Sequence, residues 1–275
     1  MKYADIHIHQ NYVNPAEKVD VKSLLNSMDR VGIEKIAVIS AYGENLQQQE
    51  TNIDIAARII AQCPDRLYGL AWIEPAHHTP LEFLEKVICE KKFRGFKMIP
   101  NHWYPCEEKL IPYYEKIAEL NVPCLFHSGI LYFKTYSSKY CRPVYYEDLI
   151  RIKNFRFALA HISWPWTDEC LALYGQWRAA KHSLCITSEM FIDITPGTPP
   201  FYRKEALKKL LLFNAEDGLI FGTDFKLTTH DFSYIQPEQW EKRINDDKEI
   251  FNQIGVSAET TEKIFYKNFL RFFRD

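Results

Sequence analysis

The sequence lacks any unbroken apolar stretch that approaches the ~20 residues a helix needs to cross a bilayer, although 47% of its 275 residues are apolar. Its first residues also lack the basic and then apolar layout of a secretory signal. We therefore expect a protein that does not span a membrane, and we expect a cytoplasmic location.

Cysteine pairing motifs are absent as well. The seven cysteines are odd in number and widely spaced, and no two of them form a Cys-x-x-Cys pair. A disulfide framework favours an even set of cysteines, and a thiolate zinc knuckle needs close pairs. We expect reduced and mostly buried thiols, and a metal site built from thiolates is not expected.

Neither sign of charge dominates. The chain has 34 Lys and Arg residues against 36 Asp and Glu residues, a net charge of −2, and the two signs are interspersed. The basic stripe that would counter a phosphate backbone is therefore missing. A nucleic acid is not an expected partner.

What the chain does have is a repeated alternation of short apolar or β-branched runs with longer segments of helical period. This alternation predicts βα units around a parallel sheet. It recurs about eight times, and 275 residues are close to the roughly 250 of an eight-fold barrel. We predict a single (β/α)8 TIM-barrel domain over residues 1–275, with additional C-terminal helices over 236–273.

The predicted strands are 3–9, 33–40, 67–73, 93–99, 122–127, 156–161, 190–194 and 219–224. The predicted helices between them are 20–31, 51–62, 81–90, 110–120, 145–152, 168–180 and 204–213. Two sizeable loops, 132–144 and 195–202, follow strands. We expect both on the catalytic face of the barrel.

Two histidines stand on the first predicted strand. Because side chains alternate along a strand, Asp5, His7 and His9 are predicted to share one face. A half-exposed strand with polar residues toward water would explain this pattern equally well. The pair alone therefore does not establish a site.

Other polar residues recur at the same kind of position, the carboxyl end of a predicted strand. These residues are Lys97, His127, His161 and Asp224. Each has a simpler explanation taken singly, such as a hydrogen-bonded core histidine or an aspartate that caps a turn. The active sites of barrel enzymes lie at the carboxyl ends of the strands. Imidazole and carboxylate groups together suit a borderline divalent ion such as zinc. Together these residues predict a catalytic metal site.

Five short strings in this order resemble the amidohydrolase superfamily. They are Asp5-Ile6-His7-Ile8-His9, Gly95-Phe96-Lys97, Leu125-Phe126-His127-Ser128-Gly129, Leu159-Ala160-His161 and Phe221-Gly222-Thr223-Asp224. More narrowly, the chain is similar to the branch that contains metal-dependent hydrolases and nonoxidative decarboxylases such as aminocarboxymuconate semialdehyde decarboxylase. The resemblance extends from Asp5 to Asp224.

The resemblance implies one divalent metal, zinc or else manganese, whose ligands are His7, His9, His127 and Asp224. His161 would be a second-metal ligand or, in a one-metal site, a catalytic histidine beside the substrate. Lys97 would bind the substrate as a cation, bridge two metals as a carbamylated lysine, or serve in packing or an ion pair. A homodimer is usual in this family.

Aromatic residues and one arginine are expected around the barrel mouth. We predict that Trp103, Trp164 and Arg142 bind a small-molecule substrate together with Lys97. An aromatic wall with one or two cations suits an aromatic or unsaturated carboxylate. The alternative is that these aromatic rings only pack loops onto the barrel.

The implied reaction is hydrolysis of a small, carboxylate-bearing ester, lactone or amide. Asp224 would accept a proton from water, and His161 would stabilise the developing oxyanion. The alternative is nonoxidative decarboxylation of an aromatic or unsaturated carboxylic acid, which an aromatic wall that excludes water would favour. Two rivals are a catalytically inactive binding barrel and a metallophosphoesterase of the polymerase-and-histidinol-phosphatase type, which needs more ligands for three metals.

Overall fold

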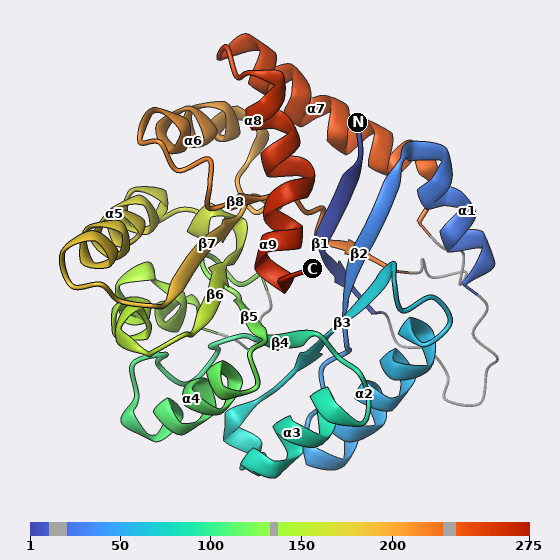
Figure 1. The fold of residues 1–275 in the computed structure, drawn as a ribbon, viewed down its shortest axis with the longest axis vertical. Helices are drawn as coiled ribbons and strands as arrows, with labels where there is room; N and C mark the ends of the chain where they lie inside the picture. Colours follow the sequence, from blue (N-terminus) through green and yellow to red (C-terminus); the bar gives the residue numbers. More distant parts are fainter. Residues whose placement is uncertain (11–20, 133–136, 228–234) are drawn as a thin grey trace.

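Parallel strands alternate with helices along the chain and curl around a common axis (Figure 1). This computed structural model describes residues 1–10, 21–132, 137–227 and 235–275. The strands are β1 (Tyr3–His9), β2 (Ile33–Ile39), β3 (Leu67–Trp72), β4 (Gly95–Met98), β5 (Pro123–Phe126), β6 (Arg156–Leu159), β7 (Glu189–Asp193), β8 (Leu219–Ile220) and β9 (Phe225–Lys226).

The sheet closes on itself. Its strand order is β8-β7-β6-β5-β4-β3-β2-β1-β9, so β8 and β9 lie at opposite ends of the order although both belong to one short stretch, 219–226. The backbone N–H of Ile6 donates to the carbonyl of Phe221 at 3.2 Å, and that of Asp224 donates to the carbonyl of His7 at 2.9 Å. These bonds join β1 to the eighth strand position and confirm the predicted (β/α)8 barrel.

Helices surround the barrel on its outer side (Figure 1). They are α1 (Lys22–Val31), α2 (Leu46–Ile60), α3 (Leu81–Cys89), α4 (Ile111–Glu119), α5 (Thr167–Ser183) and α6 (Pro200–Leu212). The predicted C-terminal helices follow as α7 (Pro237–Gln253), α8 (Ala258–Glu262), a π-helical turn (Lys263–Lys267) and α9 (Asn268–Phe273). Among the described helices, none has the length and apolar character to span a bilayer.

Several boundaries differ from the sequence prediction for local reasons. Helix α2 begins five residues early because the Asn45 side chain accepts the N–H of Gln48 as an N-cap. Helix α6 begins at Pro200, a residue suited to the first helical turn, so the predicted loop 195–202 is shorter. The predicted helix 145–152 is a 3₁₀ helix, Pro143–Arg151. Residue 20 of the predicted helix 20–31 and residues 133–136 of the predicted loop 132–144 lie outside the described residues.

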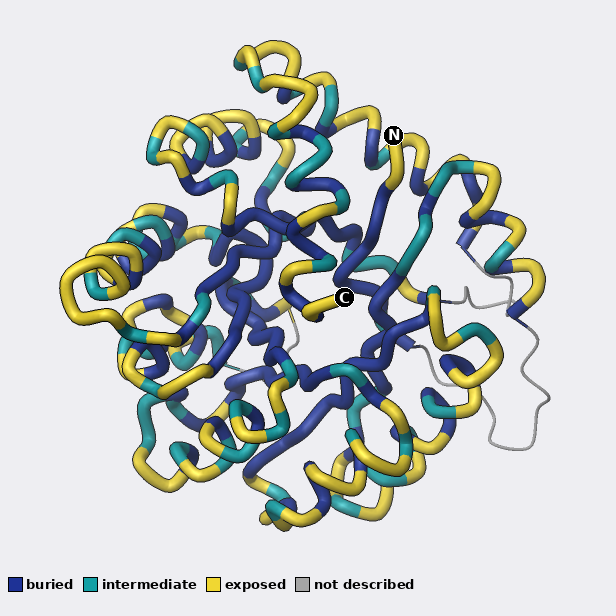
Figure 2. The backbone as a smooth tube through the Cα atoms, viewed as in Figure 1, coloured by how far each residue is buried: buried dark blue, intermediate teal, exposed yellow. Residues whose placement is uncertain are grey.

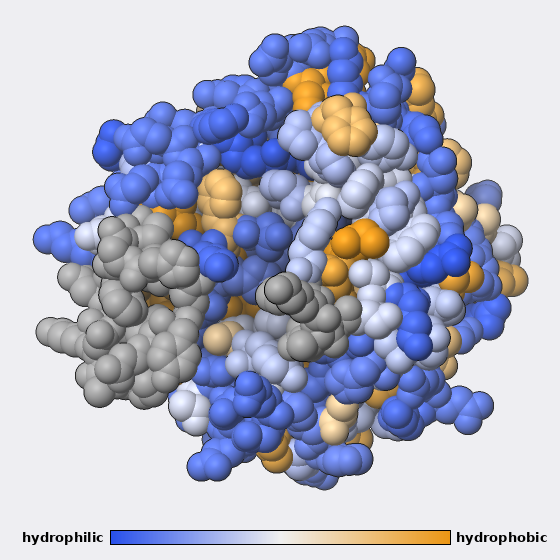
Figure 3. All heavy atoms as spheres, turned by 180° about the vertical axis from the view of Figure 1, so that it is seen from behind, coloured by the Kyte–Doolittle hydropathy of each residue, from blue (hydrophilic) through white to orange (hydrophobic). Residues whose placement is uncertain are grey.

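Two apolar layers pack the barrel, and the backbone of the strands is buried along most of its length (Figure 2). The inner layer fills the barrel with side chains such as Ile6, Leu70 and Leu125, and rings of α9, including Phe269, belong to the same cluster. The outer layer lies between strands and helices. Because β1 to β8 are packed on both faces over most of their length, the carboxyl ends of these strands are fixed relative to one another. Seen from the side opposite to Figure 1, the surface is mostly hydrophilic with small separate apolar patches (Figure 3).

An irregularity in β1 separates Asp5 from the two histidines that follow it. The pairing of β1 with β2 shifts register between Asp5 and Ile8. Ile6 lies in the inner layer but Ile8 in the outer layer, although a regular strand would place both on one face. Asp5 accepts the indole N–H of Trp240 in α7 at 3.0 Å. The prediction that Asp5 shares the face of the histidines is wrong, because the irregularity changes which residues alternate.

Candidate metal centre and active site

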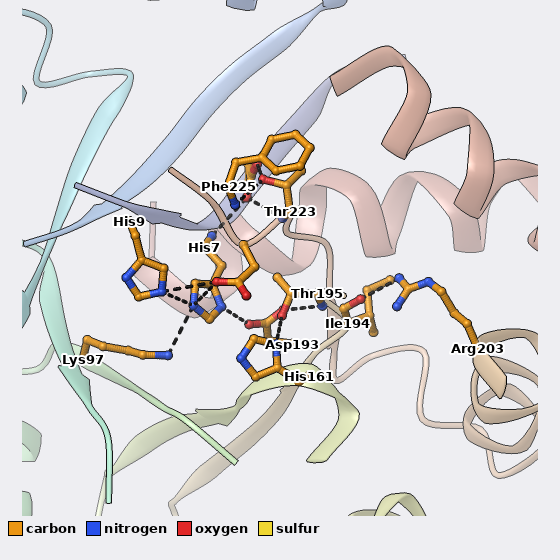
Figure 4. Close-up of polar contacts among 12 residues, drawn as sticks. His7, His9, Lys97, His161, Asp193, Ile194, Thr195, Arg203, Thr223 and Phe225 are labelled. Atoms are coloured by element: carbon orange, nitrogen blue, oxygen red, sulfur yellow. Dashed lines mark hydrogen bonds and ion pairs between the residues drawn. The ribbon is translucent and has the colours of Figure 1, made fainter. Parts of the chain in front are cut away.

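Three potential metal ligands meet where β1 faces the turn between β8 and β9, and two of them, His7 and His9, are labelled in Figure 4. The Nε2 atoms of His7 and His9 are 3.1 Å apart. Oδ1 of Asp224 lies 3.4 Å from the first and 3.3 Å from the second. Ligands at about 2.0–2.2 Å from a tetrahedral ion are separated by about 3.3–3.6 Å. The three donor atoms therefore have the spacing and the chemistry for one divalent ion.

His7 is held by a carboxylate that sequence reasoning missed. Its Nδ1 lies 2.6 Å from Oδ2 of Asp193 at the end of β7, and both side chains are fully buried. A carboxylate that accepts from one imidazole nitrogen leaves the other nitrogen unprotonated for a metal. Burial, reinforced by the nearby Lys97, holds the pKa of His7 well below its ordinary value. Both effects favour the neutral form of His7, whose Nε2 lies next to His9 and Asp224.

The sequence did contain a signal for Asp193. It is an acidic residue at the carboxyl end of a predicted strand. The other candidate residues, Lys97, His127, His161 and Asp224, were predicted from the same kind of position. Within the apolar run 190–194 it is the one charged side chain. A search for polar residues at the carboxyl end of every predicted strand would therefore have found Asp193.

Asp224 has an unusual backbone conformation and a carboxyl pKa that is lowered by its neighbours. Its φ of 59° lies in the left-handed region, which costs a non-glycine residue free energy and is frequent at functional sites. Burial opposes ionisation, but His7, His9 and His161 outweigh it and hold the pKa of the carboxyl well below its usual range. The side chains of Asp224 and His9 are 33% and 25% exposed, whereas that of His7 is fully buried. The cluster is therefore open on the side of Asp224 and His9.

His161 follows β6 and begins three consecutive residues with positive φ, at 63°, 51° and 54°. Its ring lies 5.2 Å from that of His7, and its Nδ1 is 2.9 Å from the hydroxyl of Thr195. Burial lowers the pKa of His161 to about 4. A Cβ at Gly197 would lie 2.6 Å from the Cβ of His161, so only glycine allows this approach. The structure places His161 beside the cluster, and burial favours the neutral form of its imidazole.

His127, from the end of β5, lies next to His161 with ring centroids 4.9 Å apart. Its Nε2 is 3.2 Å from the carbonyl of Ile130, to which an Nε2–H would donate. That bond leaves Nδ1 unprotonated and available. Among the described residues the compact three-donor group contains His7, His9 and Asp224 but not His127. Its role as the fourth ligand stays a prediction.

Lys97, on β4, brings a cation into the site. Its side chain is fully buried, and Nζ lies 3.4 Å from Nε2 of His7. Burial lowers the pKa of Lys97 to about 8, although the negative charges of Asp193 and Asp224 act to raise it. The position suits either an anionic substrate group or the carbamylated form.

The other predicted substrate-binding residues have partners of their own. The buried indole of Trp103 donates to the carboxylate of Glu74 at 2.8 Å. Arg142 is exposed, forms an ion pair with Glu169 and lies over the ring of Trp166. Trp164 is half-buried. The polar groups of Trp103 and Arg142 are thus engaged away from the three donors, and their contact with a substrate stays a prediction.

Comparison with known proteins agrees with this geometry. The profile of a family described as Amidohydrolase matches residues 4–274. No curated protein matches the chain.

Solved structures with the same fold include a 2,6-dihydroxybenzoate decarboxylase from Rhizobium, at 16% identity and a TM-score of 0.64, covering 99% of this chain and 98% of that one. A probable 2-pyrone-4,6-dicarboxylic acid hydrolase from Acinetobacter baumannii, with citric acid bound, has 18% identity and a TM-score of 0.66 with full coverage of both chains. A 5-carboxyvanillate decarboxylase from Novosphingobium aromaticivorans, complexed with manganese and a nitrobenzoic acid, has 13% identity and a TM-score of 0.67, covering 100% and 96%. The family match over nearly the whole chain confirms the resemblance seen in the sequence, and the chain belongs to the amidohydrolase family.

Proposed function

We propose that this protein is a metal-dependent hydrolase of a small ester, lactone or amide that carries a carboxylate. The observation that carries the proposal is the three-donor cluster of His7, His9 and Asp224, which is spaced for one ion and open on one side. A divalent ion bound there would supply a Lewis acid that activates water and polarises a carbonyl. Zinc suits this ligand set, and manganese is the alternative.

The chain's own residues would divide the work. His7, His9 and Asp224 would hold the ion, with His127 joining from β5. Asp224 is ionised and partly exposed, so its carboxylate is able to accept a proton from an attacking water. His161 would act beside the substrate.

Lys97 would bind the carboxylate of the substrate. It is a buried cation beside His7, and a charge-assisted bond to a carboxylate would offset the cost of burying it. A carboxylate-bearing substrate also agrees with the names of the similar structures, which include a pyrone dicarboxylic acid hydrolase and decarboxylases of aromatic acids. Arg142, paired with Glu169, would need to leave this partner to contribute.

The second candidate is nonoxidative decarboxylation of an aromatic or unsaturated carboxylic acid. Two of the similar structures are named as decarboxylases, and Lys97 would hold their type of substrate equally well. Decarboxylation gains from an aromatic wall that excludes water. Trp103 is engaged with Glu74, and Trp166 lies against Arg142, so support for such a wall is weaker than the sequence suggested. We therefore favour hydrolysis.

A parallel assay separates the two reactions. The protein, loaded with zinc or with manganese, would be incubated with aryl esters, lactones, pyrone carboxylates and hydroxybenzoates, and both acid release and carbon dioxide would be measured. We expect acid release without carbon dioxide, absent in Asp224→Asn. Carbon dioxide from a hydroxybenzoate would establish the decarboxylase instead, and bound metal without turnover of any compound would favour a binding protein.

A further inference from the structure

We infer that Trp72 is the residue that selects a planar ring in the substrate. Such a ring would lie against Trp72 while its carboxylate reaches Lys97. The inference rests on the function proposed above and narrows its substrate to a carboxylate attached to an unsaturated ring, such as an unsaturated lactone. It places the ring-binding wall at the carboxyl ends of β2 and β3, whereas the sequence suggested Trp103 and Trp164.

A row of rings leads away from the metal donors. The ring centroid of His9 lies 6.2 Å from that of Trp72, the last residue of β3. The centroid of Trp72 lies 5.1 Å from that of Tyr42, which in turn lies 6.1 Å from that of His77. We call these four side chains the aromatic row. Because the row begins at a potential metal ligand, Trp72 is its first ring beyond the donors.

The sheet places Trp72 beside the buried cation. Trp72 is the register partner of Lys97 in the parallel pairing of β3 with β4, and residues opposite each other in adjacent strands share one face of the pleated sheet. For both residues this is the inner face, because Trp72 belongs to the inner layer and Nζ of Lys97 approaches Nε2 of His7 (Figure 4). A ring on Trp72 and a carboxylate on Lys97 are therefore compatible with one small molecule.

Trp72 differs from the tryptophans that are anchored by a hydrogen bond. The indole N–H groups of Trp103, Trp177 and Trp240 donate to buried acceptors at 2.8 to 3.1 Å. The indole N–H of Trp72 is buried and has no hydrogen-bond partner among the described residues, although a buried indole usually finds one. An unpaired buried donor lowers stability. A use of the ring in the site therefore explains this tryptophan better than packing alone.

A flat, unsaturated ring gains more from the aromatic row than a saturated ring does. Aromatic rings attract one another in offset or edge-to-face arrangements with centroids about 4.5–7 Å apart, and the rings of the row already have this spacing. Trp72 is 8% exposed, and Tyr42 and His77 are half-buried. Because the row is narrow at Trp72 and more open beyond it, a thin ring is favoured over a thicker saturated one.

This placement is compatible with hydrolysis. The aromatic row starts at His9, whereas the side chain of Asp224 is 33% exposed. A ring bound along the row therefore leaves the Asp224 side of the donors accessible to an attacking water.

The test is the binding of two matched anions to the zinc-loaded full chain, measured by isothermal titration calorimetry. Benzoate and cyclohexanecarboxylate carry the same carboxylate, but only benzoate is flat. We expect the wild type to bind benzoate about 2- to 10-fold more tightly, the range that aromatic contacts supply beyond buried area. Trp72→Leu should abolish this preference, and Trp72→Phe should keep most of it. Because the preference is a ratio of two affinities within one protein, a general effect of a variant on the metal cancels.

Trp164→Leu is the matched comparison, since it removes a half-buried tryptophan of the other suggested wall and should leave the preference for benzoate intact. Zinc content and the melting temperature are measured for every variant. Equal affinities of the wild type for the two anions, which need no variant to be measured, would overturn the inference. A preference that survives Trp72→Leu would do the same. Neither anion is hydrolysed, so the expected preference in a protein without turnover would refute only the proposed function.

Discussion

The imidazole of His7 and the carboxylate of Asp193 meet at 2.6 Å although 186 residues separate them in the chain. Their contact joins the first strand of the barrel to the seventh. It also fixes which nitrogen of His7 faces His9 and Asp224.

Replacing Asp193 should weaken metal binding. Asp193→Asn keeps the shape of the side chain but removes the charge that orients His7, and loss of such a partner typically costs about 10- to 100-fold in metal affinity. Competition with a chromogenic chelator measures the zinc dissociation constant. Asp168→Asn, an exposed partner of Lys209, is the control and should bind zinc like the wild type. Equal affinities for wild type and Asp193→Asn would show that His7 needs no such partner.

Metal content should be close to one divalent ion per chain. Elemental analysis of the purified, metal-replete protein measures it, and His7→Ala or Asp224→Ala should lose the ion because each removes one of three clustered donors. Chelation should abolish activity, and zinc or manganese should restore it. Two ions per chain with a modified Lys97 would establish the carbamylated binuclear site. A metal-free protein under these conditions would contradict both forms.

Removing the charge of Lys97 should affect carboxylate substrates selectively. Lys97→Met should raise KM for a carboxylate-bearing substrate by about 10- to 100-fold, from about 1.5–3 kcal/mol for a hydrogen bond to a charged group. The matching neutral methyl ester or amide should be affected less. Arg142→Met is compared in parallel, since Arg142 is exposed and paired with Glu169, and we expect a small change. A large effect of Arg142→Met with none of Lys97→Met would move the carboxylate site to the barrel mouth.

The buried ion pair behind β7 should matter for stability. Asp247 is fully buried and bonded to both Arg203 and Arg243, so Asp247→Asn would leave two cations without their counterion. Breaking such a pair typically costs about 3–5 kcal/mol in the free energy of unfolding. Denaturant titration measures it, with the exposed pair of Lys209 and Asp168 as the control, where Lys209→Met should cost at most about 1 kcal/mol. Equal stability of Asp247→Asn and wild type would mean that water or a rearranged partner replaces the carboxylate.

The sequence by itself determined the barrel and the family. The alternation of apolar runs with segments of helical period predicted the order of strands and helices. The motifs from Asp5 to Asp224 identified the family, because each motif is a short string that can be read directly in the chain. Strand ends were also readable, since polar residues such as Lys97 and His161 stand out where an apolar run stops. Helix starts at α2 and α6 were less accurate, because a cap residue or a proline shifts them by a few positions.

Tertiary structure alone decided what depends on contacts between distant strands. The irregularity in β1 separates the Asp5 carboxylate from the imidazole of His7 and places it against Trp240, which no alternation rule contains. The role of Asp193 depends on its hydrogen bond to His7, which lies on another strand. Trp103 and Arg142 bind Glu74 and Glu169, partners that a linear pattern does not name. The physical reason is that the protonation and hydrogen bonds of a side chain depend on its neighbours in space. Those neighbours come from distant strands, which lie side by side only once the barrel has closed.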